Sequence, residues 1–146
     1  MAHLKPKDTR RSLPMALLRA REAVMDQFRP MLARHDVSEQ QWRVIRVVAE
    51  AGRLDATEVA ARASILAPSL TRIIRALEQR KLIKRRKDAG DGRRVMLEIT
   101  LEGSALIDRA NPESLIIYKK IATKFGKVKL EALLDLLEEL SQSRLG

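Results

Sequence analysis

The chain has 146 residues, of which 45% are hydrophobic, so it is long and apolar enough for one ordinary globular domain, and disorder is not the default. Its 29 Lys and Arg residues outnumber its 19 Asp and Glu residues, and the formal net charge of +10 indicates a polyanionic partner, nucleic acid before an anionic membrane surface. Only 3% of residues are aromatic, which disfavours a stacking platform for single strands and favours duplex DNA.

Catalysis, metal binding and membrane insertion are also disfavoured. The chain has no cysteine, which removes disulfides and thiolate chemistry and is compatible with a reducing cytoplasm. His3 and His35 cannot form a metal cluster alone, and no P-loop or G-x-S-x-G motif is present. No apolar run approaches the roughly twenty residues of a membrane span, and the polar N-terminus lacks a signal-peptide core. We expect a cytoplasmic protein that is no enzyme and needs no cofactor.

A basic arm followed by two helices is predicted at the N-terminus. Residues 1–12 are polar and basic and are expected to form a flexible arm. The apolar residues that follow recur at helical spacing and predict a long first helix, which Pro30 should kink. Ser38 and Gln41 fit the N-cap and N3 positions of a capping box, and the helix that they open is expected to end at Gly52.

The middle of the chain predicts a helix-turn-helix followed by a wing. The box Asp55-Ala56-Thr57-Glu58 opens a short helix through Arg62, and Pro68 suits the first position of a longer helix. Residues 82–85 and 95–99 are typical of two strands around a glycine-containing turn. A basic hairpin after the second helix of a helix-turn-helix is a wing.

The longer helix carries the strongest functional signal. Its apolar residues recur three and four positions apart and define one face: Leu70, Ile73, Ile74 and Leu77. Arginine forks to guanine or phosphate, and small hydroxyls let a helix approach base edges closely. We therefore predict DNA contacts for the polar residues Ser69, Thr71, Arg72 and Arg75. A merely solvated basic helix is the alternative, but from Arg72 to Arg94 ten basic residues face three acidic ones.

Helices are predicted for the rest of the chain. Thr100 should cap a helix that begins near Leu101 and is either kinked or restarted at Asn111-Pro112. A leucine stripe marks a last amphipathic helix: Leu130, Leu133, Leu134, Leu137 and Leu140. The apolar stripes at both ends exceed what a compact winged core would cover, so dimerisation is expected, with an intramolecular helical bundle as the alternative.

The fold class expected from these elements is mainly α with a small β-hairpin wing, a winged helix-turn-helix with long dimerisation helices at both ends. We divide the chain into the arm at 1–12, a helical dimerisation region at 13–36 and 101–146, and a DNA-binding region at 37–100, which together form one intertwined domain. A palindromic operator requires two recognition helices about one helical turn apart, which also favours a twofold dimer.

The chain resembles the MarR family of bacterial transcription regulators. Leu70–Glu78 and the wing signature Asp91-x-Arg93, closing at Ile99-Thr100, carry the resemblance, which covers nearly the whole chain. Further segments resemble a branch of repressors of aromatic degradation: Ala16–Ala23, Phe28–Pro30, Arg34-His35, Glu39–Arg43 and Pro68–Thr71. Asn111-Pro112 departs from the pattern of the long fifth helix.

The resemblance implies a homodimer that binds a palindromic operator in double-stranded DNA. It would repress an aromatic-acid (homoprotocatechuate-like) catabolic operon until a small phenolic or aryl-acid effector releases it. Arg93 matches the wing-tip arginine, which enters the minor groove. Arg94, Lys84 and Arg86 are further expected DNA contacts, although they could be only solvated strand charges. The competing functions are an effector-independent architectural DNA-binding protein and a peripheral membrane protein.

An anionic aromatic effector needs a cation, an apolar wall and polar groups for its ring hydroxyls. The nearest supply of such groups is Arg21, His35, Trp42, Arg43 and Arg46. Three of these residues also have simpler explanations: Trp42 as a core residue, His35 as a helix C-terminal cap, and Arg21 as the ion-pair partner of Glu22.

Overall fold

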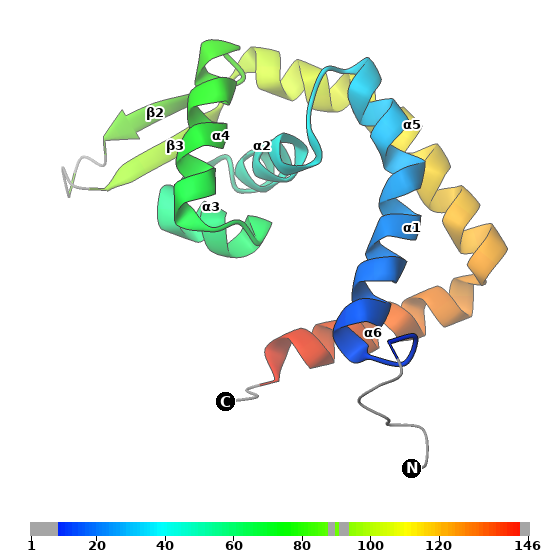
Figure 1. The fold of residues 1–146 in the computed structure, drawn as a ribbon. Coiled ribbons are helices and arrows are strands. Elements are labelled where there is room, and N and C mark those ends of the chain that lie inside the picture. Colours follow the sequence, from blue (N-terminus) through cyan, green and yellow to red (C-terminus); the bar gives the residue numbers. More distant parts are fainter. Residues whose placement is uncertain (1–8, 88–89, 91–93, 144–146) are drawn as a thin grey trace. The chain divides into compact units, whose positions relative to one another are not determined.

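The computed structural model describes residues 9–87, 90 and 94–143 (Figure 1). The described residues form two compact units, one of residues 28–112 and one of residues 9–27 with 113–143. Six helices and three strands follow in chain order: α1 (Leu13–Arg34), α2 (Glu39–Ala51), β1 (Arg53–Asp55), α3 (Ala56–Ala63), α4 (Ala67–Gln79), β2 (Ile83–Lys87), β3 (Val95–Ile99), α5 (Leu101–Phe125) and α6 (Lys127–Gln142).

Local capping signals explain where α2 and α3 begin. The Ser38 hydroxyl accepts the Gln41 N–H at 3.0 Å, and the Gln41 side chain accepts the Ser38 N–H at 3.0 Å, which is the predicted capping box. The Asp55 carboxylate accepts the Glu58 N–H at 2.8 Å. Gly52 ends α2 with φ 78°, a backbone conformation that glycine adopts without a steric penalty. The capping box at Ser38, the Asp55 N-cap and the end of α2 at Gly52 are confirmed. The second box is only half formed, because the Glu58 carboxylate lies 3.6 Å from Arg62 instead of returning to the Asp55 N–H.

Thr100 caps α5, as predicted, and also ties its start to the loop after α4. The Thr100 hydroxyl accepts the Gly103 N–H at 3.0 Å and lies within donating distance of two carbonyls, that of Lys81 at 2.6 Å and that of Leu82 at 2.9 Å. A side chain at Gly103 would collide with the Leu82 carbonyl, because an added Cβ would lie 2.2 Å from its oxygen. The close approach of α5 to this loop therefore requires glycine.

The core of unit 28–112 lies between α2, α3, α4 and the sheet, with α2 in contact with all of them (Figure 1). The predicted apolar face of α4 is confirmed, since Leu70, Ile73, Ile74 and Leu77 are all buried. The other large side chains that are fully buried come from α1, α2, α3 and the sheet: Met31, Val44, Ile45, Val48, Val59, Ile83 and Leu97. This packing holds α4 with its polar face outward.

The sheet has three antiparallel strands in the order β1-β3-β2, whereas the sequence predicted only the hairpin of β2 and β3. The missed strand, β1, is three residues long and pairs Arg53 with Glu98. Three residues are too few to show the alternation by which a strand is recognised in sequence.

Both long helices continue through their prolines. Pro30 lies inside α1 and Pro112 inside α5, so the restart considered at Asn111-Pro112 is wrong. A proline removes one N–H donor and crowds the preceding turn, but packing on either side can retain the helix. Around Pro112 that packing comes from the buried residues Ala110 and Ser114. No helix within the described residues is both long and apolar enough to cross a membrane.

The unit of residues 9–27 and 113–143 contains no buried hydrophobic side chain among its described residues. No residue of α6 is buried. Large apolar side chains are instead exposed along all three helices: Leu13, Met15, Leu17, Leu18, Val24, Leu115, Ile116, Phe125, Val128, Leu133, Leu134 and Leu136. Within its described residues, this unit therefore has an exposed apolar face and no apolar core of its own.

Candidate nucleic-acid interface and effector site

The outward face of α4 presents two guanidinium groups that are available for binding. Arg72 and Arg75 are exposed, and neither makes a hydrogen bond or ion pair with any residue that the structure describes. Thr71 is also exposed, with its hydroxyl donating to the Ala67 carbonyl at 3.2 Å, whereas Ser69 is half-buried. This face can therefore offer two cations and a hydroxyl to a polyanion without first breaking ion pairs.

The C-terminal end of α4 is fixed to the turn between α1 and α2. Arg80, the C-cap residue of α4, donates from its guanidinium to the Asp36 carbonyl. Asp36 itself has φ 55°, in the left-handed region that aspartate tolerates better than most residues. The contact joins the last turn of α4 to a chain segment 44 positions earlier and so restricts the orientation of the helix.

The base of the wing is anchored to α3. The guanidinium of Arg94, just before β3, lies 2.6 Å from the carboxylate of Asp55, which also caps α3. The N–H of Glu58 and then the Arg94 guanidinium hold the pKa of Asp55 below its ordinary value. Asp55 was predicted only as a cap, and its contact with Arg94 was missed because it joins residues 39 positions apart.

Two predicted DNA-binding residues of β2 are paired with a carboxylate on β3. Glu98 lies 2.8 Å from the Nε of Arg86 and 3.8 Å from the Nζ of Lys84. Arg53 of β1, which the sequence did not single out, donates to the same carboxylate at 2.9 Å. The Arg53 hydrogen bond, followed by the nearby positive charges, lowers the pKa of Glu98. Lys84 and Arg86 thus have a carboxylate partner within the chain.

Arg85 of the wing is ion-paired, whereas the predicted wing tip is not described. Arg85 donates to Glu78 of α4 at 2.8 Å, which joins the wing to α4. Arg93, the predicted wing-tip arginine, and Asp91 lie outside the described residues.

The structure brings together two of the predicted effector residues. The Arg46 guanidinium carbon lies 5.7 Å from the centre of the Trp42 ring, within the range of a cation–π interaction. The same guanidinium donates to the Asn111 side-chain oxygen at 3.4 Å. Trp42 is half-buried and Arg46 exposed, so the pair offers an aromatic face, a cation and an amide at one place. Asn111 was noted in the sequence only as a helix irregularity.

The other predicted effector residues are not placed in that group. His35 follows α1, and its backbone N–H donates to the Leu32 carbonyl at 3.1 Å. Arg43 is half-buried on α2. Arg21 belongs to the other unit and forms a 3.4 Å ion pair with Glu22, the simpler role considered for it.

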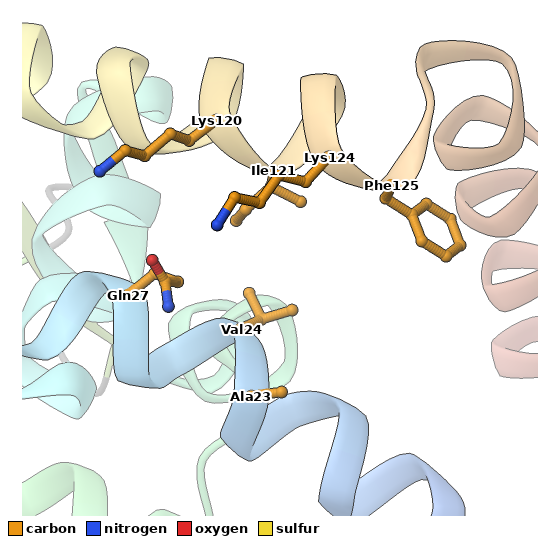
Figure 2. A pocket seen from close by; sticks show the side chains of 7 residues that line it. All are labelled: Ala23, Val24, Gln27, Lys120, Ile121, Lys124 and Phe125. Atoms are coloured by element: carbon orange, nitrogen blue, oxygen red, sulfur yellow. The ribbon is translucent and has the colours of Figure 1, made fainter.

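A groove lies between α1 and α5 in the unit of residues 9–27 and 113–143 (Figure 2). It has a volume of about 250 Å³, and none of the predicted effector residues lines it. Figure 2 shows Lys120 and Lys124 extending from α5 toward α1, where Val24 and Gln27 face them. Its lining is mainly apolar with a cationic edge: Ala23, Val24, Gln27, Lys120, Ile121, Lys124 and Phe125.

Comparison with known proteins agrees with this arrangement. A family model described as the MarR family matches residues 35–94. The homoprotocatechuate degradative operon repressor of Escherichia coli is 44% identical over 128 residues, which cover 88% of this chain and 86% of that repressor.

Two solved structures are similar over nearly their whole length. NadR in complex with 4-hydroxyphenylacetate has a TM-score of 0.82 at 43% identity, over 91% of this chain and 94% of that chain. The transcriptional repressor CouR bound to a 23-mer DNA duplex has a TM-score of 0.84 at 26% identity, over 95% of this chain and 99% of that chain.

Proposed function

The chain belongs to the MarR family of transcriptional regulators, and we propose that it is a dimeric repressor of an aromatic-acid catabolic operon, released from its operator by a small phenolic or aryl-acid effector. The observation that carries this proposal is the outward face of α4. Arg72 and Arg75 are exposed there and have no hydrogen-bond or ion-pair partner among the described residues. As a regulator that binds DNA, it would act in the cytoplasm.

DNA binding would place α4 in the major groove. Arg72 and Arg75 would read guanine or contact phosphate, while Ser69 and Thr71 allow close approach to the base edges. Arg93 would enter the adjacent minor groove, and Arg94, held by Asp55, would contact the backbone at the base of the wing. Lys84 and Arg86 would contribute less, because binding phosphate requires them to leave Glu98.

Dimerisation would cover the apolar face of residues 9–27 and 113–143. The groove between α1 and α5 combines an apolar lining with Lys120 and Lys124. The leucine-rich helix α6 has the complementary character, because acidic residues accompany its exposed leucines: Glu131, Asp135, Glu138 and Glu139. We therefore assign the groove to α6 of a second copy. The predicted division into an arm (1–12), a dimerisation region (13–36 and 101–146) and a winged region (37–100) is part of this proposal.

The effector would bind at Arg46 and Trp42. Its carboxylate would pair with the Arg46 guanidinium, its ring would pack on Trp42, and Asn111 would accept a hydrogen bond from a phenolic hydroxyl. His35 and Arg43, which belong to the same unit, stay proposed members of this site, and Arg21 stays a separate proposed effector contact. Release of DNA requires that the effector bind the DNA-incompetent conformation more tightly, and a coupling of roughly 1–3 kcal/mol, or 5- to 150-fold in DNA affinity, is typical.

Fluorescence anisotropy of a labelled duplex from the region beside this chain's own gene tests the proposal. Wild-type protein should prefer this duplex to a scrambled one, and homoprotocatechuate or 4-hydroxyphenylacetate should weaken the binding. Arg46→Gln should bind DNA normally but lose the response. Arg109→Gln removes an exposed guanidinium from α5 and serves as the matched control. Equal affinity for scrambled DNA would contradict the proposal and favour an architectural role.

A further inference from the structure

Leu66 occupies an unusual place at the start of α4. It is the N-cap residue, with φ −69° and ψ 144°, and it makes no side-chain capping hydrogen bond. The residue is 79% exposed. Ser, Thr, Asp and Asn are preferred at this position, and an aliphatic residue costs about 1 kcal/mol by comparison. Leu66 therefore contributes neither a cap nor burial to the free protein.

Hydrogen bonds on either side of Leu66 fix its backbone at the start of α4. The preceding residue, Ile65, is buried, and its N–H donates to the Ala60 carbonyl at 3.0 Å. The Leu66 carbonyl accepts the N–H of the buried Leu70 at 3.0 Å. These two anchors keep Leu66 at the tip of α4, where Ala67 and Pro68 are also exposed. The tip thus exposes three consecutive apolar residues at the N-terminal end of the helix whose outward face carries Arg72.

We propose that Leu66 is a specificity-determining residue that packs against the C5 methyl group of a thymine in the major groove. This inference rests on the proposed DNA-binding function. The N-terminal residues of a recognition helix reach base edges, and the thymine methyl is the apolar group that the major groove presents there. A leucine at this tip selects a thymine through contact with that methyl group, while the arginines farther along α4 select through hydrogen bonds.

The test combines a protein variant with removal of the methyl group from DNA. The probe is a duplex that the wild-type protein selects from a random-sequence library, in which each thymine is replaced in turn by deoxyuridine. At one thymine per half-site the replacement should weaken wild-type binding roughly fourfold, which is the contribution of one buried methyl group. Leu66→Ala should weaken binding at least as much and be insensitive to that same replacement.

Two further variants keep the result interpretable. Leu66→Ser supplies a capping hydroxyl, so it should remain folded and show the same insensitivity as Leu66→Ala. Leu101→Ala removes an even more exposed leucine, 91% exposed at the start of α5, and should behave as wild type toward every replacement.

If wild type and Leu66→Ala respond equally to every deoxyuridine, the methyl contact is overturned while the DNA-binding function stands. If the wild-type protein selects no sequence from the library, both the contact and the proposed function are overturned.

Discussion

The two units of the molecule differ in where their apolar side chains lie. Among the described residues, every buried hydrophobic side chain belongs to residues 28–112. The described residues 9–27 and 113–143 are almost entirely helical, and none of their leucines, isoleucines or valines is buried. One unit encloses its own core and can hold a recognition helix in a fixed orientation. The other unit has an apolar surface that only a further chain segment can cover, which is the property of an obligate dimer interface.

A second contrast lies within the unit of residues 28–112. Arg72 and Arg75 on α4 have no described partner, whereas Arg53, Lys84 and Arg86 share the carboxylate of Glu98. Exposed ion pairs contribute little to stability but must be rearranged before a cation meets phosphate. We therefore expect DNA affinity to depend on α4 far more than on the charges of β2.

The largest expected effect is on the stability of the unit of residues 28–112. Leu77→Ala removes a fully buried side chain and should lower the free energy of unfolding by about 2–5 kcal/mol, measured by urea denaturation at fixed protein concentration. Leu101→Ala, at a 91% exposed site, should change it by less than about 0.5 kcal/mol. Equal effects at the two sites would show that the core assigned to residues 28–112 is wrong.

The second effect concerns dimerisation through the unit of residues 9–27 and 113–143. Leu134→Glu places a charge in the exposed leucine face of α6 and should weaken dimerisation by about 2–4 kcal/mol, as expected for a central interface residue. Light scattering during size-exclusion chromatography should show a shift from dimer to monomer mass. Leu134→Met retains the apolar surface and should remain a dimer. A dimer that tolerates Leu134→Glu would remove α6 from the interface.

The third effect is on DNA affinity and compares an arginine without a described partner with an arginine that is ion-paired. Arg72→Ala should weaken operator binding by about 1–3 kcal/mol, because a direct base or phosphate contact is lost. Arg86→Ala should cost less than about 1 kcal/mol, because Arg86 is paired with Glu98 in the free chain. Anisotropy titrations at one salt concentration measure both variants. A larger loss for Arg86→Ala would reverse the proposed division of roles.

The smallest effect is the pH dependence contributed by Asp55. Its pKa is lowered in the folded state, so the folded protein binds this proton less readily than the unfolded chain does. The stabilisation is therefore complete above the ordinary pKa of 3.8 and is lost as the pH falls through the lower, folded value.

Asp55→Asn keeps a capping oxygen but removes the charge beside Arg94, and should cost no more than about 1 kcal/mol near neutral pH. Urea unfolding of both proteins between neutral and acid pH should show the difference shrinking toward acid. A difference that grows toward acid would contradict the assignment.

Local sequence signals predicted much of the fold. The apolar face of α4, the capping box at Ser38 and Gln41, and the Thr100 cap depend on residues within four positions of each other, and all are confirmed. The strand β1 was missed because its pairing with β3 joins residues about 40 positions apart and leaves almost no periodicity. The restart at Asn111-Pro112 was wrong because tertiary packing retains the helix despite the proline.

The candidate sites were predictable only in their residue types. The sequence identified Trp42 and Arg46 as effector candidates, but not the contact between Arg46 and Asn111, which are 65 positions apart. It identified Lys84 and Arg86 as cations, but not the carboxylate of Glu98 that holds them, because that pairing depends on strand register. Side-chain partners across strands and helices follow from the folded arrangement and not from local spacing.

The central claim is that one unit reads DNA while the other joins two copies. Sedimentation velocity of a fluorescent palindromic duplex tests this claim most directly. The duplex is mixed with wild-type protein, and then homoprotocatechuate or 4-hydroxyphenylacetate is added. We predict one complex of two protomers per duplex, and recovery of the free duplex with an aryl acid. A complex of one protomer per duplex, or binding that spreads along scrambled DNA in proportion to its length, would contradict the account.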